Sequence, residues 1–276
     1  MFSTDGRRAA DPAAGGVGVP HGVTVRLLGP FAVTVGEVVA GPWPRPVARR
    51  LCALVLVSPA RRITRDAASD CLFPALTPRA AARSLSKALS MAHSALAPLG
   101  PQAASLLGAD RTHVWAAADA WVDAEALTTA LHRALRTAAG AGRDEALTAA
   151  LAVDGELLAD EPYADWALGP RDELELLRQE ARLALARDRS HGAGQPGRGM
   201  AVGAVAAWQS AFDHDLACEE AAGALMRHYT AAGRRELAAR VYRRCTKALA
   251  DLGLRASPFL DDLYADVTLG PARLSS

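Results

Sequence analysis

The sequence of 276 residues predicts a mainly α-helical fold with a small α+β part near its N-terminal end. Three observations support this fold class. Alternating and β-branched residues over Val23–Val39 are typical of short strands. From Asp123 onward, apolar residues recur at helical spacing. Four residues, Ala204, Trp208, Leu225 and Met226, are matched 34 positions later by Ala238, Tyr242, Phe259 and Leu260, a period typical of stacked helix pairs.

The N-terminal half alternates strands and helices, with stop signals between them. Ser58-Pro59 ends one helix, because the residue before proline avoids the helical region, and Thr77-Pro78 is a typical helix start. The predicted elements are strands over Val23–Gly29 and Phe31–Val39, a helix over Val47–Val57, an extended stretch over Arg61–Arg65, a short helix to Leu72, a third helix over Pro78–Ala97, and a hairpin over Leu106–Trp115 that turns near Asp110. This order describes a winged helix-turn-helix domain over residues 23–118.

The third helix divides into two faces at about 100° per residue. Its predicted apolar face consists of Ala82, Leu85, Leu89, Ala92 and Leu96. The opposite face carries cations and hydroxyls, namely Arg79, Arg83, Ser86, Lys87, Ser90 and Ser94. A recognition helix needs this division, since in the major groove arginine and lysine meet phosphates and guanine edges. The alternative is an ordinary surface helix with a solvated charged face.

The charge is distributed unevenly. Residues 1–122 hold 13 Lys+Arg and 7 Asp+Glu, whereas residues 123–276 hold 18 and 23, so a net charge of +6 is joined to one of −5. This asymmetry indicates that only the first half meets a polyanion. Basic residues also precede the second helix and occupy the hairpin. The predicted DNA-binding residues are Arg61, Arg62, Thr64, Arg65, Arg79, Arg83, Ser86, Lys87, Ser90, Arg111 and His113.

The C-terminal half, residues 119–270, is predicted to be an all-helical domain of tetratricopeptide type. The predicted helices are Asp123–Thr137, Glu145–Val153, a long helix from Pro170 to about Arg187, and two pairs, 200–212 with 216–231 and 235–251 with 257–268. Gly233 and Gly253 mark turns, and His191–Gly199 is a predicted flexible loop. Trp208, Tyr229 and Tyr242 are interpreted as core residues.

No pattern of catalytic, metal-binding or cofactor-binding residues is found, so an enzyme is not predicted. Asp160-Glu161 is interpreted as a solvated or capping pair, and the four scattered cysteines as buried reduced thiols of a cytosolic protein. No apolar run of about 18 residues exists, so no membrane-spanning helix is predicted. A cytoplasmic protein is expected from the scattered cysteines and from the lack of an apolar secretory-signal stretch in residues 1–22. Residues 1–22 are expected to be a disordered arm, and residues 271–276 a tail.

Several short segments, in order, resemble the antibiotic-regulatory activators of actinobacteria. In the first half these are Leu27-Leu28-Gly29-Pro30-Phe31, Pro46–Leu51, Ser58–Asp66 and Leu72-Phe73-Pro74; in the second, Val122-Asp123, Glu156-Leu157-Leu158, Trp166, Arg171–Leu174, Leu225–Tyr229, Gly233-Arg234, Ala239, Tyr242 and Leu252-Gly253-Leu254. The resemblance covers about residues 23 to 268. It implies an OmpR-type winged helix followed by a bacterial transcriptional activation domain. The implied function is sequence-specific activation of a secondary-metabolite pathway, with double-stranded promoter DNA and RNA polymerase as partners, a homodimer on direct repeats, and no cofactor.

One departure from that family concerns the third helix. The family continues this helix with arginines, whereas Met91-Ala92-His93-Ser94 stands here, so the basic face is thinner. An alternative function therefore stays open. In it, the chain is a regulator or scaffold that does not bind DNA and acts through protein contacts of the helical domain.

Overall fold

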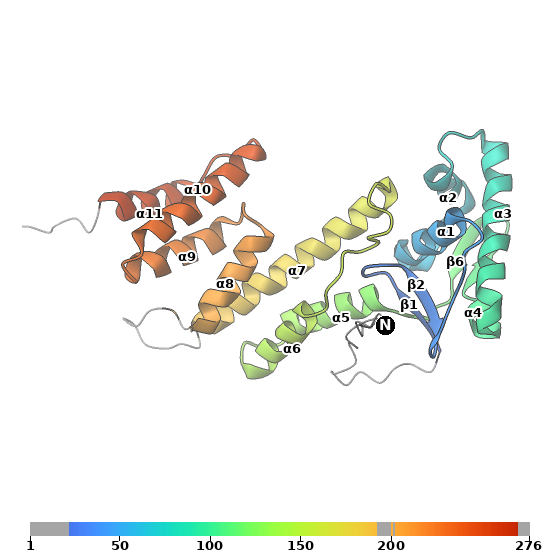
Figure 1. Ribbon diagram of the computed structural model, residues 1–276, viewed down its shortest axis with the longest axis horizontal. Helices are drawn as coiled ribbons and strands as arrows, with labels where there is room; N and C mark the ends of the chain where they lie inside the picture. Colours follow the sequence, from blue (N-terminus) through green and yellow to red (C-terminus); the bar gives the residue numbers. More distant parts are fainter. Residues whose placement is uncertain (1–21, 192–199, 201, 270–276) are drawn as a thin grey trace, which may run out of the picture. The chain divides into compact units, whose positions relative to one another are not determined.

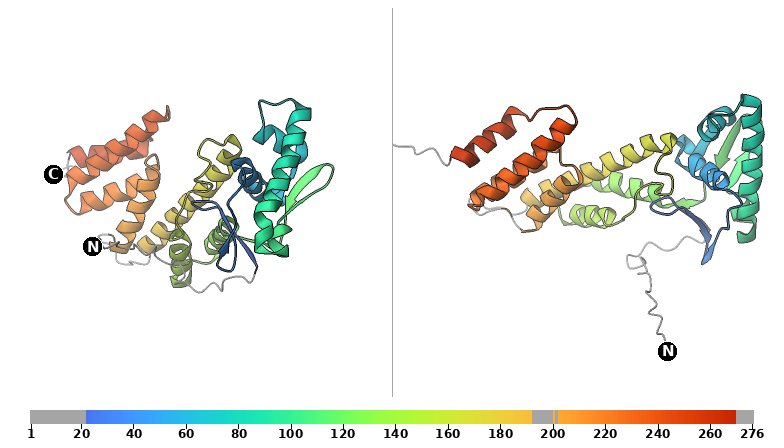
Figure 2. Two further views of the ribbon diagram at one scale, coloured as in Figure 1. Left: turned by 45° about the vertical axis from the view of Figure 1, so that its right-hand side comes forward. Right: turned by 45° about the horizontal axis from the view of Figure 1, so that its top comes forward.

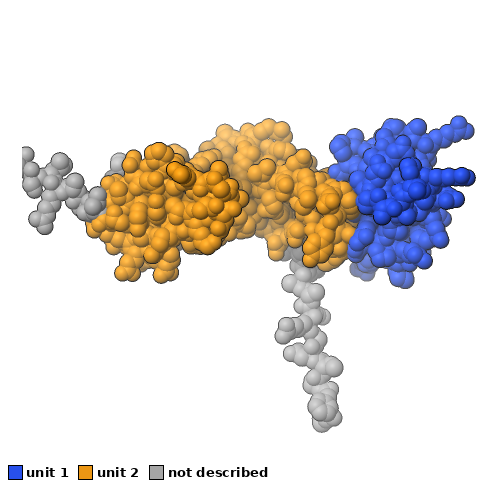
Figure 3. Space-filling model, turned by 90° about the horizontal axis from the view of Figure 1, so that it is seen from above, with its two compact units in different colours: residues 1–25, 32–121 blue, residues 26–31, 122–276 orange. Residues whose placement is uncertain are grey.

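The structure, a computed structural model, describes residues 22–191, 200 and 202–269. The predicted arm up to residue 21, the loop 192–199 and the tail 271–276 lie outside these residues. The described chain forms two compact units (Figure 3). The first unit holds residues 22–25 and 32–121, and the second holds residues 26–31 and 122–269.

The elements alternate between strands and helices up to residue 122 and are helical afterwards (Figure 1). In chain order they are β1 (Val23–Arg26), β2 (Ala32–Val35), β3 (Val38–Val39), α1 (Pro46–Val57), the 3-10 turn η1 (Pro59–Arg61), β4 (Arg62–Thr64), α2 (Arg65–Leu72), α3 (Pro78–Leu96), the 3-10 turn η2 (Ala97–Leu99), α4 (Pro101–Ala104), β5 (Leu107–Ala109), β6 (His113–Ala116), β7 (Trp121–Val122), α5 (Asp123–Arg136), α6 (Ala141–Leu151), α7 (Asp165–His191), α8 (Val202–His214), α9 (Glu219–Ala231), α10 (Arg235–Asp251) and α11 (Pro258–Leu269). The predicted fold class is confirmed.

Two small sheets accompany the first three helices. One has the strand order β3-β2-β1-β7, and the other is antiparallel with the order β4-β6-β5. In the second sheet, Ile63 of β4 is paired with Val114 of β6, and Ala109 of β5 is paired with the same residue from the other side. Leu51 of α1, Leu85 of α3 and Val114 are fully buried, so helices and hairpin share one apolar core.

The buried face of α3 matches the predicted apolar face only in part, since Leu85, Ala92 and Leu96 are buried but Leu89 is half-buried. Ala82 is exposed, and the fully or nearly buried residues are Ala81, Leu85, Ala88, Ala92, Ala95 and Leu96. Both α1 and α2 pack against α3, so the core face is wider than a single stripe. Alanine fits a core and a surface equally well, and helical spacing alone cannot choose between Ala81 and Ala82. The predicted polar face is confirmed as exposed, including Arg79, Arg83 and Lys87.

In the second unit, helices α8 to α11 form the two predicted antiparallel pairs (Figure 2). Ala204 and its repeat mate Ala238 are both fully buried, as the 34-residue echo predicts. Gly233 and Gly253 adopt φ of 72° and 74°, which favours glycine after a helix end. Trp208 is a core residue, and its indole donates to Ser190 Oγ over 2.8 Å. Tyr229 and Tyr242 are only half-buried.

Further details differ from the sequence expectations. Helix α7 begins at Asp165 rather than Pro170, since a proline in the second turn removes only one hydrogen bond of the ladder. Helix α6 begins at Ala141 and includes Gly142. Glu161 is buried rather than solvated, and Cys71 is exposed, whereas Cys52 and Cys245 are buried as expected. Burial raises the pKa of the Cys245 thiol to about 11.

Candidate nucleic-acid interface

The candidate interface consists of α2, α3 and the hairpin formed by β5 and β6, all in the first unit. Thr64 begins α2 as its N-cap, because its hydroxyl accepts the backbone N–H of Ala67 over 3.2 Å. Thr77 is the N-cap of α3 and Pro78 is its first helical residue, although the Thr77 side chain makes no capping hydrogen bond. The hairpin runs beside α3, as two views show (Figures 1 and 2). These elements form a helix-turn-helix with an adjacent wing.

The outer face of α3 carries the uncommitted cations. Arg79, Arg83 and Lys87 follow one another at four-residue spacing, so they lie along one side of the helix. All three side chains are exposed and bond to no described residue, and the same holds for the Ser90 hydroxyl. Their charges are therefore available to an anionic partner, since no ion pair with another described residue engages them.

Arg65 connects the three elements of the interface. Its backbone N–H donates to the carbonyl of Thr112 in the wing over 2.8 Å. Its guanidinium donates from Nη2 to Ser86 Oγ on α3 over 2.7 Å. Since Arg65 is also the first residue of α2, the start of α2, the middle of α3 and the wing meet at one residue. The three segments that carry the predicted DNA-binding residues are therefore in contact with one another.

A polar network stiffens the turn of the wing. The Asp110 carboxylate accepts hydrogen bonds from the backbone N–H groups of Thr112 and His113, both over 2.7 Å, and from the Thr112 hydroxyl over 2.9 Å. These bonds favour the ionised form and lower the Asp110 pKa to about 2. Nδ1 of His113 lies 3.1 Å from Nη2 of Arg62. Arg111, in the same turn, is exposed and bonds to no described residue.

Arg61 has a structural contact that the sequence does not predict. Its Nη1 donates to the carbonyl of Ala117 over 2.7 Å, and its backbone has a φ of 52°. The guanidinium therefore joins the start of β4 to the chain that follows β6. Arg62 contacts His113 in the wing, and Arg65 contacts Ser86 on α3.

The segment that departs from the family pattern contributes a contact between α3 and the wing. Nε2 of His93 lies 2.9 Å from the carbonyl oxygen of Leu107 in β5. A carbonyl accepts only, so this nitrogen carries the proton and donates. His93 is half-buried, which means that it supports the wing rather than extends the exposed basic face. Sequence reasoning missed this role, because its partner lies 14 positions away.

The base of the wing requires a glycine at position 108. Gly108 and Trp115 face each other across β5 and β6, and a methyl group added at Gly108 would overlap the Trp115 indole. We therefore expect Gly108→Ala to destabilise the protein by about 1–3 kcal/mol, as overpacking does, measured by urea denaturation. Combining Gly108→Ala with Trp115→Ala removes the clash, so the double variant should lose less stability than the two single losses summed. A strictly additive loss would contradict this account.

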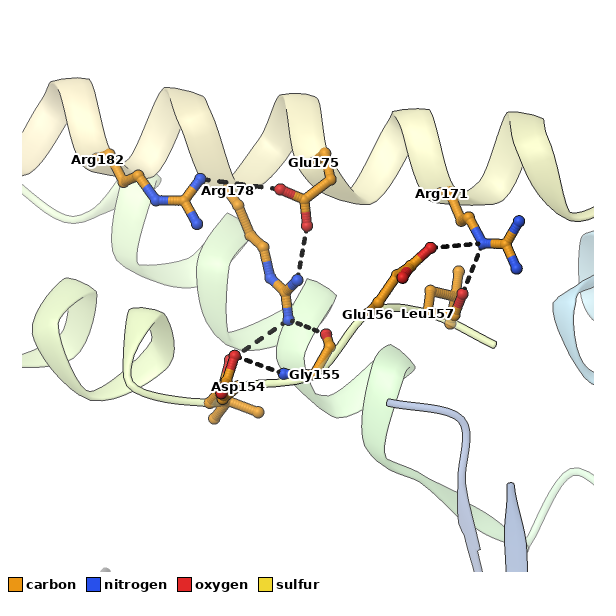
Figure 4. Close-up of polar contacts among 9 residues, drawn as sticks. Asp154, Gly155, Glu156, Leu157, Arg171, Glu175, Arg178 and Arg182 are labelled. Atoms are coloured by element: carbon orange, nitrogen blue, oxygen red, sulfur yellow. Dashed lines mark hydrogen bonds and ion pairs between the residues drawn. The ribbon is translucent and has the colours of Figure 1, made fainter. Parts of the chain in front are cut away.

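In the second unit, two buried arginines of α7 hold the segment 153–161 (Figure 4). Arg171 donates to the carbonyls of Leu157, Leu158 and Glu161 over 2.8, 2.7 and 2.7 Å. Arg178 donates to the carbonyls of Val153 and Gly155, and it forms an ion pair with Glu175 at 2.6 Å. Both arginines stand on the helix face that otherwise carries Ala167, Leu174 and Ala181. The sequence signal for these contacts is an arginine at a core position of a helix.

The same segment pairs with residues 26–31, which the sequence analysis placed in the first domain. Leu28 forms a bridge with Leu157, and the N–H of Leu158 donates to the carbonyl of Leu27 over 2.7 Å. The Asp123 carboxylate accepts the backbone N–H groups of Leu27 and Leu28 over 2.7 and 3.1 Å. The Leu27-Leu28-Gly29-Pro30-Phe31 motif is thus bound by contacts of the second unit.

Two kinds of feature are absent from the described part of the chain. No group of three or more histidine, cysteine or acidic side chains is placed to hold a metal ion among the described residues. None of the described helices combines the length and the apolar character that crossing a membrane requires.

Comparison with known proteins identifies the second half of the chain. Residues 118–268 match the family model of the bacterial transcriptional activator domain. No curated protein matches the sequence. A solved structure of Mycobacterium tuberculosis EmbR in complex with a low-affinity phosphopeptide is similar, with 22% identity and a TM-score of 0.59. The match covers 90% of this chain and 65% of the EmbR chain, so this chain spans under two thirds of that protein's length.

The family model covers more than half of the chain, and the similarity to EmbR extends the shared fold to the winged helix. The predicted resemblance to the antibiotic-regulatory activators is thereby confirmed at the level of family and fold. The chain belongs to the bacterial transcriptional activator domain family and has the fold of a transcriptional regulator.

Proposed function

We propose that the chain is a sequence-specific activator that binds double-stranded promoter DNA through its winged helix. Helix α3 enters the major groove, and the start of α2 and the wing hold the phosphate backbone. The observation that carries this proposal is the row formed by Arg79, Arg83 and Lys87, all exposed and without a partner among the described residues. Helix α3 contains no acidic residue, so these three cations have no ion-pair partner on their own helix.

The residue types on α3 indicate how the groove would be read. Arginine and lysine donate to O6 and N7 of guanine, and each well-placed pair is worth about 1–3 kcal/mol of discrimination. The row lies in the first half of α3, as in helix-turn-helix proteins whose recognition helix contacts bases with its N-terminal residues. Ser90 and Ser94 are short, so the second half of the helix offers no long cation. The proposal therefore expects a short guanine-containing half-site.

The partners of the second unit are proposed from the family. As in the activators that the chain resembles, the helical unit contacts RNA polymerase, and two copies bind direct repeats upstream of a secondary-metabolite promoter. Binding to promoter DNA places the protein at the nucleoid in the cytoplasm. In vitro transcription from a promoter carrying the selected site tests the polymerase contact, and footprinting gives the repeat spacing.

The DNA-binding proposal is tested by selection from a random duplex library, followed by anisotropy titration at several salt concentrations. Each neutralised phosphate contributes a slope of about −0.9 in log K against log salt. With Arg62, Arg65, Arg111 and a cation of α3 on phosphates, we expect a slope of about −3 to −4. Enrichment of one sequence with that slope supports the proposal. Failure to enrich any sequence, with only weak binding, contradicts it.

A second function is favoured by the end of α3, where His93 bonds to Leu107 in place of the family's arginines. In this alternative the chain binds no DNA and acts as a scaffold through the helical unit. Capture of RNA polymerase holoenzyme by a chain that enriches no duplex would support the alternative.

A further inference from the structure

Ser86 lies on the exposed face of α3, yet its hydroxyl is already engaged within the protein. It donates to the carbonyl of Ala82 over 3.1 Å and accepts Nη2 of Arg65 over 2.7 Å. A serine hydroxyl has one proton and two lone pairs. The proton takes part in the bond to the helix backbone, and one lone pair accepts the hydrogen bond from the guanidinium. In this arrangement Ser86 donates neither to a phosphate nor to the acceptor atoms of guanine, and one lone pair remains.

Arg65, by contrast, keeps most of its donors. Its backbone is fixed by the N-cap Thr64 and by the bond to Thr112 in the wing, and its side chain is fixed by Ser86. A guanidinium has five N–H donors in a planar fork, of which Ser86 accepts one. A long side chain that is held before binding loses less conformational freedom on binding.

We propose that Ser86 is a positioning residue that holds the Arg65 guanidinium for the DNA backbone and reads no base itself. This inference rests on the proposed function, since it assigns roles within the same interface. It revises the sequence-based prediction that Ser86 contacts DNA directly. It also makes Arg65 a phosphate contact whose affinity depends on a residue 21 positions away.

The proposal predicts a particular pattern of losses. Ser86→Ala keeps the charge of Arg65 but removes the hydrogen bond that positions its guanidinium. The affinity for DNA should therefore fall about three- to tenfold, the usual effect of one hydrogen bond, and the salt slope should stay unchanged. The loss is the same on every single-base variant of the site, because phosphate contacts carry no sequence information. A base-reading serine would instead relax the preference at one base pair.

The experiment uses the full chain and the duplex enriched by the wild-type protein, with affinities measured by anisotropy. The variants are Ser86→Ala, Ser86→Thr, Arg65→Ala and the Arg65→Ala, Ser86→Ala double variant. Threonine keeps the hydroxyl, so Ser86→Thr should bind within about twofold of the wild type, as retention of the bond requires. Arg65→Ala should reduce the salt slope by about 1. The double variant should bind no more weakly than Arg65→Ala alone.

Several outcomes overturn the proposal while leaving DNA binding intact. These are unchanged affinity in Ser86→Ala, a loss confined to one base pair, or fully additive losses in the double variant. Since alanine favours helix, Ser86→Ala is expected to fold, and a thermal melt by circular dichroism checks this. If the wild-type chain enriches no duplex at all, the proposed function and this inference fail together.

Discussion

Replacement of both Arg83 and Lys87 by alanine is expected to weaken binding to the selected site about 100-fold or more. Each residue, when bidentate to guanine, is worth about 1–3 kcal/mol of discrimination, and the two lie one helical turn apart. Neither side chain has a partner among the described residues, so the substitutions break no described internal bond. Anisotropy titration gives the affinity, and the enriched sequence pool gives the specificity. The same variant should lose activation of the target gene.

The control variant removes the same charge from another exposed helix. Arg240 and Arg243 of α10 are exposed, and replacing both by alanine should change affinity by about twofold at most, since charges outside the contact surface are largely screened. Similar losses in the two double variants would indicate non-specific attraction to the whole chain. Unchanged binding and activation by the Arg83→Ala, Lys87→Ala variant would exclude groove recognition by α3.

Replacement of Arg171 by alanine is expected to destabilise the second unit by about 3–5 kcal/mol. The guanidinium is buried and is the donor to three carbonyls, those of Leu157, Leu158 and Glu161. Hydrogen bonds from charged groups contribute about 1.5–3 kcal/mol each, and buried acceptors left without donors add a cost. Because the second unit holds about 150 residues, the melting temperature should fall by about 10 °C. Circular dichroism and urea denaturation measure both quantities.

Arg187 provides the matched control on the same helix. Its side chain is 46% exposed and forms an ion pair with Glu220, so Arg187→Ala should cost under about 1 kcal/mol. Arg171→Ala should also loosen residues 26–31, because Leu27 and Leu28 are bound to Leu158 and Leu157. Faster amide exchange at Leu158 would report this loosening. Equal and small losses of stability in the two variants would show that the hydrogen bonds of Arg171 are unimportant for stability.

Much of the local structure follows from short-range chemistry. Thr64, Thr77-Pro78 and Ser58-Pro59 mark helix ends through capping and proline sterics, which act within a few residues. Gly233 and Gly253 mark turns because only glycine adopts positive φ at no cost. The exposed row of Arg79, Arg83 and Lys87 follows from helical periodicity, since burying an unpaired cation is prohibitive. Periodicity does not distinguish Ala81 from Ala82 on α3, because alanine fits a core and a surface equally well.

The sequence by itself therefore determined the fold class, the order of the elements and which side of α3 presents its cations. The tertiary structure decided how individual polar side chains are used. Arg61 bonds to Ala117 at a separation of 56 positions, and Arg65 bonds to Ser86 at 21. Phe31 donates to Asp160 across 129 positions. The physical reason is that a side chain's identity fixes how many hydrogen bonds it can make, whereas only the packing of distant segments fixes with which partner.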